Sequence, residues 1–98
     1  MNLLDATTPC ALVERATIDA NCRKMGSHIQ ALGARLRPHV KTHKCAEVAL
    51  LQTAGHFGGI TVSTLAEAEF FFEAAFTDIT YAVPLTPDRV ERVLALRR

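Results

Sequence analysis

The sequence predicts an α/β protein built from parallel strand-helix units, and three observations lead to this prediction. Segments with the composition of strands alternate with segments of helical periodicity from residue 35 onward. The connections between them are short and carry glycine, proline or helix-capping residues. This order is typical of right-handed βαβ units, either in a doubly wound sheet or in a (β/α) barrel.

Composition places the chain among globular proteins and gives no sign of a charged partner. The 98 residues are 49% hydrophobic and 21% charged, with a formal net charge of +1. This charge balance favours neither a nucleic acid nor a membrane surface as a partner. We expect 1–98 to be one domain or part of one, with a leading strand and helix in 1–34 and three βα units in 35–98.

The cysteines and the N-terminus indicate a cytoplasmic protein. The three cysteines form no C-x-x-C pair, so neither a zinc ribbon nor a disulfide framework is expected. The first residues lack the basic and apolar regions of a signal peptide.

The first elements are a short strand and a long helix. Residues 9–14 form an apolar run after Thr-Thr-Pro, which favours a strand. A helix is expected over 17–32, with Thr17 as its cap and Gly33 as its stop. Its apolar stripe consists of Ile18, Cys22, Met25, Ile29 and Leu32.

A second strand is expected over 35–42, where polar and apolar residues alternate. Arg35, Arg37, His39 and Lys41 share one face, and Leu36, Pro38 and Val40 share the other. Pro38 has no N–H to give to a strand ladder, so it should lie at an irregular or unpaired position.

The remaining elements follow the same alternation. We expect a helix over 46–53 ending at Gly55, a strand over 58–63, and a helix from the capping box of Thr64 and Glu67 to about Phe76. A strand over 78–83 and a helix beginning at Pro87 complete the chain. Three barrel strands cannot close a barrel and leave open edges, so we expect the chain to be a fragment of a larger fold.

Reactive groups are expected near residue 41. Three cations and two histidines lie within one stretch of eight residues, Arg37-Pro38-His39-Val40-Lys41-Thr42-His43-Lys44. Lys41 ends its strand, and reactive groups of parallel α/β folds gather at the carboxyl ends of strands. Val40 should face the covering helix, whereas Lys44 should lie in the solvated loop.

Simpler interpretations of this stretch remain open. A cluster of basic residues and histidines before a helix is commonly a solvated loop. His39 and His43 lack a third zinc ligand nearby, and Cys45 is expected to be a small buried residue rather than a nucleophile.

Three further expectations concern the other strands and the phenylalanine run. Thr61 and Ser63 should face the barrel interior if Ile60 and Val62 face the helices. Tyr81 is expected to have a structural role rather than to reach a cofactor. Of the consecutive Phe70, Phe71 and Phe72, at least one must lie near the surface.

The stretch 37–44 around Lys41 resembles the lysine motif of the D-threonine aldolase and D-serine dehydratase family. These are alanine-racemase-like, fold-type III enzymes that use pyridoxal 5′-phosphate (PLP). The resemblance extends over nearly the whole chain, through Thr8-Pro9, the run 59–64, Glu67-Ala68-Glu69 and the run 78–82. It implies the N-terminal part of a PLP-binding (β/α)8 barrel, with strands 35–42, 58–63 and 78–83 as the first three and 9–14 paired with a C-terminal β-domain.

The resemblance also implies site residues and partners. Lys41 matches the lysine that binds PLP as a Schiff base and acts as acid and base, and His39 and Thr42 match cofactor-site positions beside it. The full-length family adds a divalent metal ion, whose ligands are not in this chain, and forms homodimers. The substrates are small D-amino acids.

The resemblance leaves the reaction open. A D-amino-acid lyase, of aldolase or dehydratase type, is the expected function of the parent enzyme. A related amino-acid racemase and a non-catalytic PLP-binding protein are the alternatives. The 98 residues are expected to be inactive by themselves, because most of the cofactor site is missing.

Overall fold

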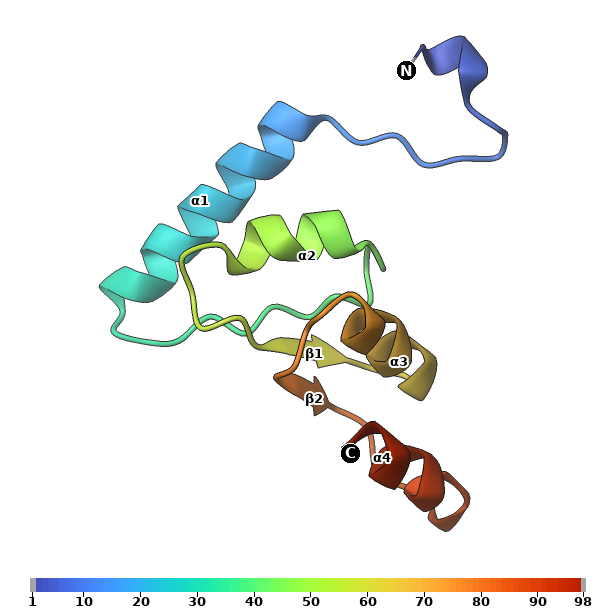
Figure 1. Ribbon diagram of the computed structural model, residues 1–98. Coiled ribbons are helices and arrows are strands. Elements are labelled where there is room, and N and C mark those ends of the chain that lie inside the picture. The colour runs from blue at the N-terminus through green and yellow to red at the C-terminus, as the bar shows by residue number, and fades with distance from the viewer. Residues whose placement is uncertain (1, 98) are drawn as a thin grey trace.

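The computed structural model describes residues 2–97 as helices arranged around a small parallel sheet (Figure 1). No helix in this range is long and apolar enough to cross a membrane. In chain order the elements are η1 (Leu3–Asp5), α1 (Arg15–Ala31), α2 (Ala46–Thr53), β1 (Ile60–Val62), α3 (Leu65–Glu73), β2 (Ile79–Tyr81), η2 (Pro87–Arg89) and α4 (Val90–Leu96).

The sheet confirms the expected parallel α/β arrangement. Strands β1 and β2 pair in parallel, with Thr61 opposite Thr80. On the other edge of β1, a parallel bridge joins His39 to Thr61. The segment that leads to Lys41 is therefore the neighbour of β1, and three consecutive chain segments lie side by side in the order that βαβ units require.

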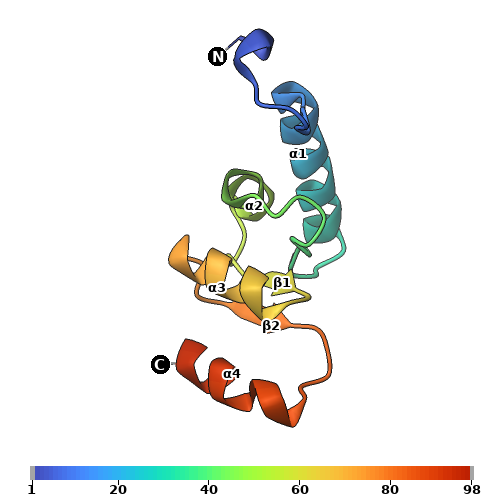
Figure 2. The same cartoon turned by 90° about the vertical axis from the view of Figure 1, so that its right-hand side faces the viewer.

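One face of the sheet packs against helices and forms the core. Val40, Ile60 and Val62 are fully buried there, together with Phe71 of α3. The ring of Phe71 meets that of Phe76 edge to face, with centroids 5.6 Å apart. The predicted orientation of Val40 toward a helix is confirmed. Helix α3 comes after β1 in the chain and α4 comes after β2. Figure 2 shows α3 next to the two strands and α4 below β2.

The opposite face of the sheet is polar and more exposed. Residues paired in a parallel ladder point to the same face, so His39, Thr61 and Thr80 form one row across it. Thr61 is half-buried and Thr80 is exposed. This confirms the predicted opposition of Thr61 to the buried Ile60 and Val62.

The strand expected over 35–42 is reduced to the single bridge at His39, and hydrogen bonding explains both of its limits. The ladder toward the amino end would need an N–H from Pro38, which proline lacks. Toward the carboxyl end it would join the Ser63 amide to the Val40 carbonyl. That carbonyl accepts from the Lys44 amide at 3.0 Å, and the Ser63 amide donates to Glu67 Oε2 at 2.9 Å.

The prediction of a strand over 9–14 is wrong. These residues form an unpaired stretch between η1 and α1 (Figure 1), and the side chains of Leu12 and Val13 are 66% and 71% exposed. A strand needs a partner for its backbone groups, and within residues 2–97 this stretch has none.

Several boundaries also differ from those expected. Helix α1 begins at Arg15 with Glu14 as its N-cap, and Thr17 donates to the Glu14 carboxylate at 2.7 Å instead of capping the helix. Helix α2 has the expected bounds. The two strands are shorter than expected, and the turn at Pro87 is a 3₁₀ helix that precedes α4.

The molecule is open rather than compact. Its Cα radius of gyration is 15.6 Å, whereas a compact domain of 100 residues has about 13 Å. Its extents are 44 × 41 × 20 Å. These dimensions fit a part of an α/β fold in which the outer edges of the sheet have no strand partner among residues 2–97.

Candidate active site

Two connections lie at the carboxyl end of the sheet beside the candidate residues. The first, residues 41–45, follows the bridged segment and carries Lys41. The second, Ser63 and Thr64, links β1 to α3, whose first turn carries Glu67. A hollow of about 280 Å³ lies between Lys44 and α3 and does not reach Lys41; its other lining residues are Thr64, Ala66, Glu67, Phe70 and Phe71.

Lys41 is the first residue of its turn, and its side chain is exposed. Among residues 2–97 the side-chain amine has no hydrogen bond or ion pair, so it is accessible for chemistry. The backbone around it is fixed from both sides. The Val40 amide donates to the Thr61 carbonyl at 3.0 Å, and the Lys44 amide closes the turn on the Val40 carbonyl.

His39 supports the same turn from the sheet. Its side chain is half-buried, and its Nδ1 accepts a hydrogen bond from the Lys41 amide at 3.3 Å. An accepting Nδ1 in a neutral imidazole places the ring proton on Nε2. His39 and Lys41 are thus linked through the Lys41 backbone.

Thr42 is oriented toward a different residue. Its hydroxyl lies 3.3 Å from Nδ1 of His43. Burial lowers the pKa of His43 below its usual value, which favours the neutral ring. The Nε2 atom of His43 is buried without a hydrogen-bond partner in the described part of the chain. Of the three predicted site residues, the structure therefore links His39 and Lys41 and turns Thr42 toward His43.

Glu67, which the sequence identified as half of a capping box, lies in the first turn of α3 next to the β1–α3 connection. Its Oε2 accepts hydrogen bonds from the amides and hydroxyls of both Ser63 and Thr64, at 2.7–3.0 Å. Burial by itself would raise the pKa of Glu67, but these donors outweigh it and hold the pKa below its ordinary value of 4.5. Its Oε1 is buried without a partner among residues 2–97. The T-x-x-E pattern was the signal for this contact.

Two other sequence expectations are resolved here. Cys45 is half-buried at the N-cap of α2 and donates to Glu47 at 3.1 Å, so it is less buried than expected. Tyr81 packs against the core, and its hydroxyl accepts from Arg89 at 2.9 Å. The structural interpretation of Tyr81 is confirmed.

Lys41 supplies an accessible amine, a group through which a cofactor could be held covalently, at the carboxyl edge of a parallel sheet. Buried atoms of His43, in the turn after Lys41, and of Glu67, in the first turn of α3, lack a partner among residues 2–97. Buried polar atoms normally have a partner in the protein or in ordered water. Within residues 2–97 no three His, Cys, Asp or Glu side chains are grouped to hold a metal.

Comparison with known proteins identifies relatives that match nearly the whole chain. The chain is 49% identical over 96 residues, 98% of its length, to a D-threo-3-hydroxyaspartate dehydratase from Delftia. The solved structure of that enzyme superposes with a TM-score of 0.89 over 97% of the chain. The chain is a homologue of the D-amino-acid dehydratases and aldolases.

Other proteins similar to this chain are also D-amino-acid enzymes or alanine-racemase-like proteins. A D-serine dehydratase from Dictyostelium discoideum is 42% identical over 86% of the chain and 22% of its own length. A D-threonine aldolase from Arthrobacter is 39% identical over 74% of the chain and 19% of its own length. An alanine-racemase-like protein from Idiomarina loihiensis superposes with a TM-score of 0.86 at 39% identity, over 95% of the chain.

The likeness covers only part of each relative. The chain spans 25% of the Delftia enzyme and 25% of the solved Idiomarina protein. No protein-family model matches the sequence. The expected α/β fold and the suspected relationship to D-threonine aldolase and D-serine dehydratase are confirmed.

Proposed function

We propose that this chain supplies the cofactor-lysine segment of a PLP-dependent lyase that acts on D-amino acids. The observation that carries the proposal is the exposed Lys41 at the carboxyl edge of a parallel sheet. Its setting is a chain that is 49% identical to a D-threo-3-hydroxyaspartate dehydratase. The substrates are β-hydroxy-D-amino acids, as the names of the dehydratase and aldolase relatives suggest.

The proposed roles combine the family resemblance with the contacts of each residue. Lys41 Nζ holds the cofactor covalently and moves the proton at the substrate Cα. His39 orients Lys41 through the hydrogen bond to its backbone amide. Thr42 is a cofactor-site residue beside them that contacts His43. PLP, when bound, takes up the electrons released at Cα.

The scope of the proposal is the segment within a larger enzyme. The 98 residues are inactive by themselves, because the described residues offer one amine and few of the other contacts that a phosphate and a pyridine ring require. The larger enzyme is a cytoplasmic homodimer. Residues outside this chain would hold the divalent metal ion that the resemblance implies.

A hybrid enzyme tests the proposal. The chain replaces the matched quarter of the Delftia dehydratase, and ammonia release from D-threo-3-hydroxyaspartate is measured. We expect an active hybrid whose Lys41→Arg variant loses activity by on the order of a thousandfold or more, as when other covalent catalysts are removed.

Lys44→Arg is the matched control, because Lys44 is also an exposed lysine of the same turn. We expect this variant to keep most of the activity. A folded hybrid in which Lys41→Arg is as active as Lys44→Arg would refute the proposed role. Turnover by the 98-residue chain alone would refute its predicted inactivity.

A further inference from the structure

The backbone that carries Lys41 is attached to the sheet by few hydrogen bonds. Among residues 2–97, two backbone hydrogen bonds join this segment to β1: one from the Val40 amide to the Thr61 carbonyl at 3.0 Å, and one from the Thr61 amide to the Pro38 carbonyl at 2.9 Å. The ladder is blocked on one side by Pro38 and on the other by the bonds of Lys44 and Ser63. A single bridge is a weak means of fixing a catalytic residue.

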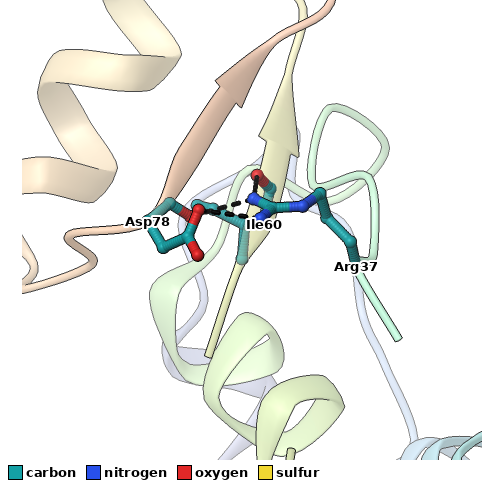
Figure 3. A network of polar contacts seen from close by, with 3 residues as sticks. All are labelled: Arg37, Ile60 and Asp78. Carbon is teal, nitrogen blue, oxygen red and sulfur yellow. Dashed lines mark hydrogen bonds and ion pairs between the residues drawn. The ribbon is translucent and has the colours of Figure 1, made fainter. Parts of the chain in front are cut away.

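The side chain of Arg37 makes a second attachment on the amino side of this bridge (Figure 3). Its Nη1 donates to the Ile60 carbonyl at 3.1 Å and to the Asp78 carbonyl at 3.3 Å. Its Nη2 donates to the Asp78 carboxylate at 2.8 Å. One guanidinium therefore links the Lys41 segment to the starts of both β1 and β2.

The packing around Arg37 is built to accept this side chain. The centroid of the Phe57 ring lies 4.9 Å from the guanidinium carbon of Arg37. Gly59 passes so close beneath it that an added Cβ would come within 2.8 Å of that carbon and closer still to the Phe57 ring. Gly59 therefore leaves the space in which the guanidinium crosses from one strand to the next.

We propose that Arg37 is a positioning residue that fixes the strand register, and hence the location, of Lys41. Arg37 and Lys41 lie on opposite sides of the bridge along the segment. The two attachments thus hold the segment on either side of Pro38, whose nitrogen has no hydrogen to donate. The consequence for Lys41 chemistry rests on the function proposed above; the attachment itself does not.

The ion pair alone contributes little to overall stability. The side chains of Arg37 and Asp78 are 30% and 51% exposed, and exposed ion pairs are screened by water. The effect of Arg37 should therefore be local. This separates a positioning role from a general contribution to stability.

Amide hydrogen exchange of the 98-residue chain tests the attachment without any cofactor. Arg37→Lys keeps the charge but cannot keep all three hydrogen bonds, because one ammonium nitrogen replaces the two guanidinium nitrogens that make them. We expect exchange at the Val40 and Thr61 amides to speed up by about tenfold, the effect of losing one hydrogen bond to a charged group. Exchange in α3 should stay unchanged.

Arg35→Lys is the matched control. Arg35 stacks on the same Phe57 ring at 3.9 Å, yet it makes no hydrogen bond within residues 2–97. We expect unchanged exchange at Val40 and Thr61. Equal acceleration in both variants, acceleration throughout the chain, or no protection of these amides in the unsubstituted chain would each overturn the proposal.

The hybrid enzyme tests the consequence for Lys41. We expect Arg37→Lys to lower kcat severalfold more than Arg35→Lys does. Unchanged kcat together with accelerated local exchange would refute the positioning role. A failure of the proposed role of Lys41 would be recognised by a different result, an active Lys41→Arg hybrid.

Discussion

Glu67 accepts four hydrogen bonds with a single carboxylate oxygen and so closes the turn that faces the Lys41 turn. This arrangement makes a prediction about acid stability. The donors hold the pKa of Glu67 below 4.5, so the folded state binds the proton less readily than the unfolded state. The stabilisation is complete above about pH 4.5 and is lost as the pH falls through the lowered folded-state pKa.

Glu67→Gln should lower the free energy of unfolding at pH 7 by about 1–2 kcal/mol, because hydrogen bonds to a neutral amide oxygen are weaker than those to a carboxylate. The difference from the unsubstituted chain should shrink as the pH falls below 4.5. Denaturant unfolding at several pH values measures it. Glu73→Gln, at the exposed end of the same helix, should have little effect. A difference that is constant with pH would contradict the prediction.

Single residues show what the sequence can and cannot predict. Alternation separated Val40, which is buried, from Lys41, which is exposed. The same pattern could not predict the contact of Arg37 with Asp78, because that contact joins residues 41 positions apart. Nor could it show that Thr42 turns to His43, since a side-chain rotamer depends on tertiary packing.

At the scale of elements, the helices were predicted better than the strands. A helix is fixed by local caps and periodicity, and the capping box at Thr64 was read directly from the sequence. A strand exists only through its neighbours. The stretch 9–14 lacks a neighbour in the described chain, and the expected strand 35–42 is limited by Pro38 and by competing bonds.

The end of α3 shows a local conflict that a substitution can relieve. The helix stops at Glu73, earlier than expected, and Ala75 has a φ of 72°. This left-handed conformation favours glycine. Ala75→Gly should therefore raise the free energy of unfolding by about 1 kcal/mol, as measured by denaturant unfolding.

The neighbouring alanine gives the control. Ala74 has a φ of −82° and lies against the core. Ala74→Gly should lower the free energy of unfolding by about 0.5–1 kcal/mol, because glycine gains backbone freedom in the unfolded state. If both substitutions changed stability in the same direction, the conformation at Ala75 would not be the cause.

At the scale of the whole molecule, the chain is an open portion of an α/β fold. Its radius of gyration of 15.6 Å and its coverage of 25% of the Delftia dehydratase describe the same situation. Strand-helix alternation and the lysine motif were enough to predict the fold class and the relatives. The partners of His43 Nε2 and Glu67 Oε1 could not be predicted, because these buried atoms have none among residues 2–97.

The most direct test of the central claim is to locate the cofactor attachment. The hybrid enzyme is incubated with PLP, reduced with borohydride, digested and mapped by mass spectrometry. The chain contributes three lysines, Lys24, Lys41 and Lys44. We predict that the reduced cofactor is attached to Lys41. Attachment to Lys24, to Lys44 or to a lysine outside this chain would contradict the account.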